Sequence, residues 1–231
     1  MRKKQRISFF IDGYNLFYGL KSLKKQNYKW LNIKKLSEYL INPNAEEIAI
    51  IHYFTTKVII PADIQELPEN IRQPRMTGFK TKQANQEQYL SALRTLPNVN
   101  IHYGKYKNKI YQCPKCHQSY AQPTEKITDV NISVQALLGA HNNEYDTAYF
   151  ITGDTDIAPA MQAVGNSSFN KLVKVAFPPN RKNDYIKNLL PNSYRQIKEK
   201  TILKCLFAPK VKTNTGYEII CPQQWQVVTA I

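Results

Sequence analysis

The chain has 231 residues, enough for one large domain or for one domain with an appendage. An apolar content of 42% and an aromatic content of 11% support a sizeable core, so intrinsic disorder is not expected. Lysine and arginine number 32 against 17 acidic residues, and the resulting net charge of +15 favours phosphate-rich partners through counterion release. A basic protein without such a partner is the alternative.

The charged start of the chain resembles the beginning of a secretory signal. However, Asp12 interrupts the apolar run behind it, and no small-residue cleavage pattern follows. No segment approaches the roughly 18 continuous apolar residues that a membrane helix needs. Four cysteines, two of them in a C-x-x-C pattern, do not resemble a secreted disulfide framework. We therefore expect a cytoplasmic protein with no membrane partner.

Apolar runs typical of strands alternate with helical patterns from residue 6 to about residue 197. The expected strands are 7–11, 48–54, 99–106, 147–152 and 172–177. The expected helices are 16–24 and 36–40, then 86–96, 128–141, 157–164 and 184–190. The predicted apolar face of helix 128–141 consists of Val130, Val134, Leu137, Leu138 and His141. This alternation predicts an α/β fold, a doubly wound parallel sheet with helices on both faces.

Two polar segments interrupt this alternation. Residues 61–85 contain three prolines and several basic residues, and they predict a long loop or lid. Residues 107–124 form an insertion that contains the C-x-x-C pattern. We expect residues 1–197 to form the main domain. Residues 198–231 are expected to be a small basic extension, packed on it or tethered to it, with strand-like pieces at 216–221 and 225–231.

Residues 149–156 carry the strongest functional signal. There an apolar run ends in a glycine and two carboxylates, Asp154 and Asp156, and a helical pattern follows. The first strand stops in the same way at Asp12, directly before Gly13. Ligands bind outside the carboxyl ends of the strands in open α/β sheets, so we expect these carboxylates to meet at one edge. Asp129, in the first turn of helix 128–141, is expected at the same edge.

Each of these residues also has a structural alternative. Asp12-Gly13 is a common turn signal, and Asp129 would interact favourably with the dipole of its helix. Asp156 is a candidate helix cap, whereas Asp154, directly after its strand, has no comparable structural role. Asn15 is positioned either to cap the first helix or to reach a substrate. Asp146 precedes its strand and is expected at the opposite edge of the sheet.

Four aspartates at one edge would repel one another unless a cation were bound. Hard oxygen ligands suit Mg²⁺ or Mn²⁺, and such an ion can activate water and stabilise charge on a phosphoryl oxygen. A haloacid-dehalogenase phosphatase would need a second aspartate two residues after Asp12, where Tyr14 stands. The chain has no P-loop, no dinucleotide glycine fingerprint and no recognisable Ser-His-Asp or Cys-His arrangement. An acidic centre in a basic protein predicts a metal-dependent nuclease.

Three blocks together resemble the signature blocks of NYN-domain proteins (the LabA-like group), which belong to the PIN-like superfamily of ribonucleases. The blocks are Ile11-Asp12-Gly13-Tyr14-Asn15, Glu125-Lys126-x-Thr128-Asp129-Val130-Asn131-Ile132 and Thr152-Gly153-Asp154-Thr155-Asp156. The strand at 173–177, followed by Pro178 and Pro179, is also similar, so the resemblance covers most of the chain.

The resemblance implies a PIN-like, flavodoxin-like parallel sheet, a Mg²⁺-bound acidic centre and cleavage of RNA phosphodiester bonds. It assigns the metal and the catalysis to Asp12, Asp129 and Asp154, with Asp156 as a fourth acidic residue. Asn15, Lys126 and Thr152 match polar positions that flank the site and are expected to bind substrate. Thr152 stands where serine is commoner, and it keeps the hydroxyl.

Cys113 and Cys116 enclose a Pro-Lys turn, the shape of half a zinc knuckle. Two ligands do not close a tetrahedral Zn²⁺ site, and His117 is too close in sequence to be an easy third. Cys205 and Cys221 would have to fold back to complete it. The sequence leaves four alternatives for Cys113 and Cys116: structural zinc, free thiols, a disulfide, or a site shared by two chains of a homo-oligomer.

Basic and aromatic residues near 72–82, 105–107 and 181–182 are expected to contact RNA, mainly single-stranded RNA. The main hypothesis is a Mg²⁺- or Mn²⁺-dependent endoribonuclease. A non-catalytic RNA-binding or regulatory module with the same fold is the first alternative. A structure-specific deoxyribonuclease of the flap type is the second, but such enzymes usually have a helical arch, which the pattern of residues 61–85 does not predict.

Overall fold

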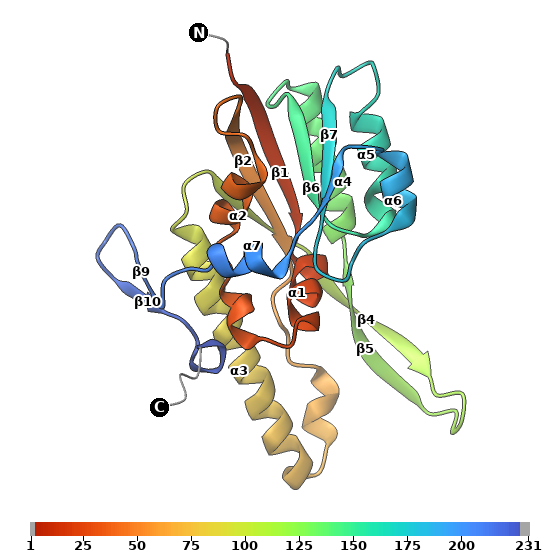
Figure 1. Ribbon diagram of the computed structural model, residues 1–231. Coiled ribbons are helices and arrows are strands. Elements are labelled where there is room, and N and C mark those ends of the chain that lie inside the picture. Colours follow the sequence, from red (N-terminus) through yellow and green to blue (C-terminus); the bar gives the residue numbers. More distant parts are fainter. Residues whose placement is uncertain (1–2, 227–231) are drawn as a thin grey trace.

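A six-stranded parallel sheet forms the centre of the molecule (Figure 1). The computed structural model describes residues 3–226, with the side chains of residues 62, 107–109 and 120–123 outside that description. The strand order is β3-β2-β1-β6-β7-β8, and every neighbouring pair is parallel. The strands are β1 Gln5–Asp12, β2 Glu46–Thr55, β3 Val99–Tyr103, β6 Thr147–Ile151, β7 Leu172–Phe177 and β8 Tyr194–Gln196. The predicted doubly wound parallel sheet is confirmed.

Helices cover both faces of this sheet (Figure 1). One face carries α1 Gly13–Ser22, α2 Ile33–Leu40, α3 Glu69–Arg94 and α7 Glu199–Lys204. The other carries α4 Thr128–His141, α5 Ala158–Val164 and α6 Asp184–Leu189. Short 3₁₀ turns are η1 Gln26–Trp30, η2 Ala62–Glu66, η3 Thr155–Ile157 and η4 Gln223–Trp225. Along β1, Ile7, Phe9 and Ile11 pack on the first face and Phe10 on the second, so the strand is apolar almost throughout.

The winding of the sheet reverses between β1 and β6. From β1 the chain moves outward through β2 and β3, and it then returns to β6 and continues the other way to β7 and β8. The crevice outside the carboxyl ends of the strands at such a switch point is where open α/β sheets bind ligands. Asp12 ends β1, and Ile151, just before the Thr152-Gly153-Asp154 segment, ends β6.

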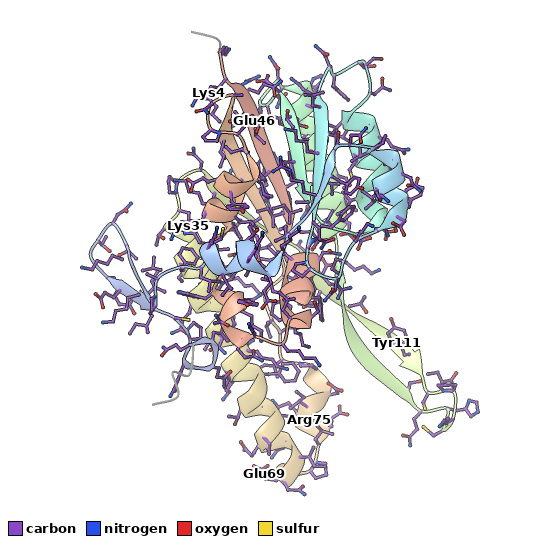
Figure 2. The ribbon with its side chains drawn as sticks, viewed as in Figure 1. Lys4, Lys35, Glu46, Glu69, Arg75 and Tyr111 are labelled. Atoms are coloured by element: carbon purple, nitrogen blue, oxygen red, sulfur yellow. The ribbon has the colours of Figure 1, made fainter. Side chains whose placement is uncertain are left out.

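The structure corrects two predictions about helices. Residues 61–85 are not a loop, because α3 begins at Glu69 and continues unbroken through Pro74. Its first half projects beyond the sheet, where Glu69 and Arg75 lie far from the core (Figure 2). Of the helix, Tyr89, Leu90, Ala92 and Leu93 are buried, all in the last two turns. The projecting half therefore has no buried face to give its sequence a helical period.

The predicted apolar face of α4 is also wrong. Val130, Val134 and Leu138 are 60%, 48% and 49% exposed. The buried side chains of this helix are Thr128, Ile132, Ala136, Gly139 and Ala140. Small residues bring α4 close to its neighbours: a Cβ on Gly139 would lie 2.8 Å from the Tyr145 ring. Of the predicted face, Leu137 packs against the core, whereas Val130, Val134 and Leu138 are left on the solvent side.

Two appendages extend from this frame. The insertion forms a hairpin of β4 Lys105–Gln112 and β5 Ser119–Lys126, and Tyr111 lies on it well away from the sheet (Figure 2). The C-terminal segment forms α7 and a second hairpin of β9 Lys210–Lys212 and β10 Glu218–Ile220. Its Cys205, Phe207 and Ile219 are buried in the same core as β1, so this segment packs on the sheet domain. The strand-like piece predicted at 225–231 begins in η4, and residues 227–231 lie outside the described residues.

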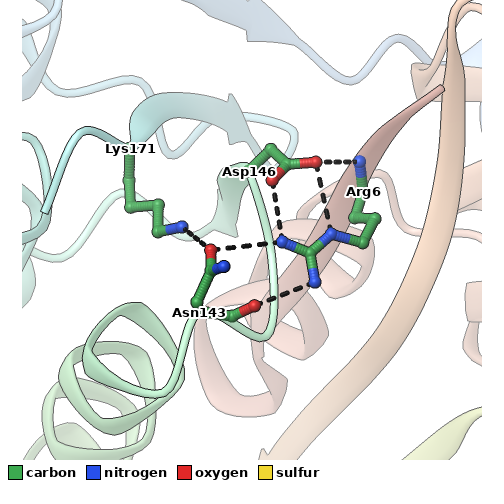
Figure 3. A network of polar contacts seen from close by, with 4 residues as sticks. All are labelled: Arg6, Asn143, Asp146 and Lys171. Carbon is green, nitrogen blue, oxygen red and sulfur yellow. Dashed lines mark hydrogen bonds and ion pairs between the residues drawn. The ribbon is translucent and has the colours of Figure 1, made fainter. Parts of the chain in front are cut away.

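Asp146 lies at the amino end of β6, the edge opposite the switch-point crevice. Its carboxylate pairs with the Arg6 guanidinium at 2.8 Å, and Asn143 and Lys171 complete the network (Figure 3). This ion pair ties the amino ends of β1 and β6 together, which confirms that Asp146 is not part of the acidic centre. Within residues 3–226, no helix has the length and apolarity to cross a bilayer.

Candidate metal centre

Three carboxylates meet at the switch point. One ligand oxygen each from Asp12, Asp129 and Asp154 lies within 4.8 Å of the other two. They come from three elements: the end of β1, the first turn of α4 and the segment directly after β6. They share a cavity of about 240 Å³, whose lining residues are Asp12, Tyr14, Asn15, Tyr18, Glu125, Thr128, Asp129, Asp154 and Arg181.

Asp12 is held rigidly at the bottom of this cavity. Its side chain is only 3% exposed; Oδ1 accepts a hydrogen bond from the Asn15 backbone N–H (2.9 Å) and Oδ2 accepts one from the Thr152 hydroxyl (3.0 Å). Asp12 is therefore the N-cap of α1, a role that the sequence left open for Asn15. Because both of its oxygens are already oriented, Asp12 offers a fixed ligand position.

Asn15 and Thr152 connect the two strand ends. The Asn15 Oδ1 accepts from the Gly153 N–H, and the Thr152 hydroxyl accepts from the Asp154 N–H, both at 3.0 Å. Thr152 is 1% exposed, so its hydroxyl orients two carboxylate-bearing segments and is not open to substrate. Asn15 is half-buried and lines the cavity, where its side chain is also accessible from the crevice.

Asp154 and Asp156 have roles different from those expected. The Asp154 Oδ1 accepts from the Asp156 N–H at 3.0 Å, so Asp154 caps η3 and does have a structural role. Asp156 is exposed in the first turn of η3 and is not among the residues that line the cavity. Its charge still reaches Asp129, whose carboxyl pKa it helps to raise.

The segment directly before α4 contributes a further carboxylate, Glu125, which was not predicted to belong to the site. Glu125, at the end of the hairpin, lines the cavity and accepts hydrogen bonds from the Thr128 N–H (3.1 Å) and hydroxyl. Between them, Ile127 has a φ of 83°, a left-handed conformation that is costly for a β-branched residue. The signal for Glu125 was its place at the start of the second motif block. Lys126 is exposed and does not line the cavity. It lies opposite Lys105 in the strand register at the base of the hairpin.

The acidic cluster carries uncompensated negative charge. Burial, together with the charges of Asp129 and Asp154, raises the pKa of Asp12 to about 6, although the bonds from Asn15 and Thr152 oppose this. Burial and the charges of Asp154, Glu125 and Asp156 raise the pKa of Asp129 to about 6 as well. In the described part of the chain, no ion pair includes Asp12, Asp129 or Asp154. This set of oxygen donors fits a hard divalent cation.

The cysteines do not form a comparable centre. Cys113 and Cys116 are free thiols at the tip of the hairpin, and Cys205 and Cys221 are buried in the main core. Among the described residues, the acidic cluster is the only group of three or more potential ligands that lie close enough to share a metal. Within the described residues, therefore, no third ligand for zinc lies beside Cys113 and Cys116 at the tip of the hairpin.

A doubly wound parallel sheet with a carboxylate cluster at its switch point defines the class of protein: a PIN-like α/β domain. The chain belongs to the NYN domain family, whose family model matches residues 6–189, and this places it in the PIN-like nuclease superfamily. The 6-hydroxy-3-succinoylpyridine 3-monooxygenase HspA of Pseudomonas putida (strain DSM 28022 / S16) is 29% identical over 188 residues. That match covers 69% of this chain and 55% of HspA, so the chain spans about half the length of this relative.

A solved structure is also similar. It is a protein of unknown function, VPA0982, from Vibrio parahaemolyticus RIMD 2210633. The superposition has a TM-score of 0.49 with 16% sequence identity, and it covers 86% of this chain and 98% of that one.

Proposed function

We propose that this NYN domain is a metal-dependent endoribonuclease that hydrolyses RNA phosphodiester bonds, with Mg²⁺ or Mn²⁺ held by Asp12, Asp129 and Asp154. The observation that carries the proposal is the approach of these three carboxylates to within 4.8 Å of one another, unpaired, in a chain of net charge +15. Like charges at this separation are costly unless a cation lies among them. The net positive charge of the chain attracts a polyanion such as RNA.

The bound metal would supply an activated water and neutralise charge that develops on the phosphate. Asp12 contributes a fixed oxygen, because the backbone N–H of Asn15 and the hydroxyl of Thr152 hold the orientation of its carboxylate. Asp129 and Asp154 are only partly buried and form the side of the cluster that faces the cavity. Asp156, which is exposed outside the cavity lining, would act on the site through its charge. Asn15 lines the cavity within reach of substrate.

A cation near the phosphate is supplied best by Arg181, which lines the cavity. Lys126 was expected in this role, but its side chain is exposed outside the lining, so we assign the contact with a non-bridging oxygen to Arg181. A guanidinium binds phosphate in a bidentate geometry, which suits this position. Thr152 supports the site from behind through Asp12 and Asp154.

The decisive experiment compares the parent with Asp154→Asn and with Asp63→Asn on labelled single-stranded RNA, with and without Mg²⁺ or Mn²⁺. Asp63 is an exposed residue of η2, so its substitution is the same chemical change away from the cluster. We expect Asp154→Asn to lose at least about a hundredfold in cleavage while RNA binding is retained or tightened. Asp63→Asn should behave like the parent. Equal cleavage by Asp154→Asn and the parent would refute the assignment.

A structure-specific deoxyribonuclease is the second candidate, and the observation in its favour is α3. This helix has 26 residues, about 39 Å in length, and its projecting half carries Arg72, Arg75, Lys80 and Lys82. Parallel digests of single-stranded RNA and a DNA flap decide between the two substrates. A non-catalytic RNA-binding module is disfavoured because carboxylates facing a phosphate weaken binding unless a metal is present. RNA binding with no cleavage in either metal would favour that module.

A further inference from the structure

An aromatic surface extends along α1 from the acidic cavity. The helix buries Gly13, Leu16, Gly19 and Leu20, which leaves three rings on its outer side. We call Tyr14, Phe17 and Tyr18 the α1 platform. Tyr14 and Tyr18 line the cavity, and their ring centroids are 6.1 Å apart. Tyr18 is 42% exposed, so part of its ring surface is open to a ligand that reaches the cavity. Phe17 is 38% exposed and extends the aromatic surface beyond the cavity lining.

Two cations lie over the ring of Tyr18, the central ring of this platform. The Arg181 guanidinium is 5.6 Å from the centroid of Tyr18, and the Lys21 ammonium is 5.7 Å from it. In the described residues no ion pair includes Arg181, although Asp12, Asp129 and Asp154 line the same cavity. Its guanidinium is therefore available to an anion that enters from outside.

The position of Arg181 is set by the backbone around it. The Arg181 N–H donates to the Pro178 carbonyl at 3.1 Å, which closes a turn directly after β7. The neighbouring Asn180 amide donates to the Ser22 hydroxyl of α1 at 2.9 Å. On the other side, a Cβ on Gly153 would lie 1.9 Å from the Arg181 carbonyl oxygen, so the turn rests directly on the segment that carries Asp154. The backbone of Arg181 is thus held between α1 and the segment that carries Asp154.

The exposed ring of Tyr18 and the cation of Arg181, which forms no ion pair in the described residues, line the same cavity as the proposed metal centre. A ring and a cation at this spacing suit the base and the phosphate of one nucleotide. Bases stack on aromatic rings, and arginine binds the phosphate next to them. In a duplex the base faces are covered by their neighbours in the stack, so only an unpaired base can use such a ring.

We propose that the α1 platform and Arg181 bind the nucleotide adjacent to the scissile phosphate of single-stranded RNA. Its base stacks on Tyr18, and Arg181 holds its phosphate. This inference takes its substrate class from the proposed ribonuclease function, and it adds the residues that select an unpaired strand. Tyr18 and Arg181 would bind the substrate directly, and they are separate from the carboxylates that hold the metal.

The test measures RNA binding without metal, so that it is independent of cleavage. Fluorescence anisotropy in EDTA would compare a labelled single-stranded RNA of about ten nucleotides with the same sequence in a duplex. We expect Tyr18→Ala to weaken binding of the single strand about tenfold and to leave the duplex unchanged. Tyr18→Phe keeps the ring and should bind like the parent. Tyr39→Ala, which removes a 47% exposed ring from α2, is the matched control.

The role of Arg181 is read from the salt dependence. Arg181→Ala should lower the slope of log affinity against log salt concentration by about 0.7, the value for one phosphate contact on a single strand. Tyr18→Ala should leave this slope unchanged. Arg181→Lys, which keeps the charge, should restore most of it.

Three results would overturn the inference: unchanged binding by Tyr18→Ala, an equal loss with Tyr39→Ala, or no measurable RNA binding by the parent. A separate cleavage assay distinguishes this failure from that of the proposed function. If the parent binds RNA through Tyr18 but never cleaves it with Mg²⁺ or Mn²⁺, the α1 platform stands as a nucleotide-binding site and the proposed ribonuclease function is refuted. If the parent cleaves RNA, and Tyr18→Ala cleaves it equally fast and binds it with equal affinity, the ribonuclease function stands and the role of the α1 platform is refuted.

Discussion

The Thr152 hydroxyl donates a hydrogen bond to Asp12 Oδ2 across the gap between the ends of β6 and β1, at 3.0 Å. The Thr152 hydroxyl oxygen itself accepts a hydrogen bond from the backbone N–H of Asp154, also at 3.0 Å. One buried hydroxyl thus fixes the positions of two of the three carboxylates. The cluster is held by bonds between the strand ends in addition to the packing of the sheet.

Removal of this hydroxyl should weaken both the fold and the metal site. We expect Thr152→Val to leave the Asp154 N–H and one Asp12 oxygen without their partner, with a loss of about 1–3 kcal/mol in the free energy of unfolding. Mn²⁺ affinity, measured by calorimetry, should fall about tenfold because Asp12 is no longer oriented. Thr152→Ser keeps the hydroxyl and should match the parent in both measurements. A Thr152→Val variant with parental Mn²⁺ affinity would contradict this role.

The stability of the metal-free protein should depend on pH in a direction set by Asp12. Its pKa is 3.8 in an ordinary environment and about 6 in the folded chain, so folding favours the protonated carboxyl. Between about pH 4 and pH 6 the folded state binds more protons than the unfolded state, and the contribution of this group to stability therefore falls as the pH rises. Above about pH 6 the destabilisation is complete, and Asp129, whose pKa is raised in the same way, adds to it.

Urea unfolding in EDTA at pH 5 and pH 7.5 checks this dependence. The difference in the free energy of unfolding between the two values should shrink in Asp12→Asn, which cannot ionise, by on the order of 2 kcal/mol. Added Mn²⁺ should stabilise the parent at pH 7.5 and much less at pH 5, because protonation competes with the metal. The same pH dependence in Asp12→Asn and the parent would show that other groups dominate.

The sheet and the three aspartates were predictable from the sequence for a specific physical reason. Strands buried on both faces are apolar almost throughout, as in residues 7–11, where Ser8 is the exception, and the carboxyl ends of parallel strands share one edge. Residues such as Asp12 and Asp154 that end neighbouring strands must then meet, whatever the side-chain details. Asp129 follows because its helix begins above the same edge.

The rest of the site depends on contacts that a linear pattern does not encode. Glu125 reaches the cavity from a polar hairpin through the left-handed turn at Ile127, and Arg181 arrives from a turn that packs on Gly153. The sequence of each turn does not reveal which side chain it brings into the cavity. The prediction for the projecting half of α3 was wrong for a different reason. A helix without a buried face has no apolar period in its sequence, and Pro74 is a residue that usually interrupts helices.

The strained turn before α4 offers a prediction about stability. Ile127 has a φ of 83° and a side chain that is 42% exposed, so its burial compensates little for the strain. Asparagine adopts this conformation more readily than a β-branched residue, and Ile127→Asn should raise the free energy of unfolding by about 1 kcal/mol. Ile127→Val keeps the β-branch and should show no gain. Chemical denaturation of the three proteins is sufficient, and a destabilised Ile127→Asn would mean that the isoleucine side chain makes contacts that outweigh the strain.

Gly153 should tolerate no side chain, because the methyl group of alanine would lie 1.9 Å from the Arg181 carbonyl oxygen, a backbone atom. Gly153→Ala must displace the turn that carries Arg181, and we expect a loss of about 1–3 kcal/mol in stability together with weaker RNA binding. Gly78→Ala is the contrasting control. It lies within α3 with nothing within 4 Å of the added methyl group, so alanine there should stabilise the helix by up to about 1 kcal/mol. Thermal unfolding and RNA anisotropy of the two variants test whether the position of Arg181 depends on the missing side chain at residue 153. Parental RNA affinity in Gly153→Ala would mean that the turn can move without loss of the phosphate contact.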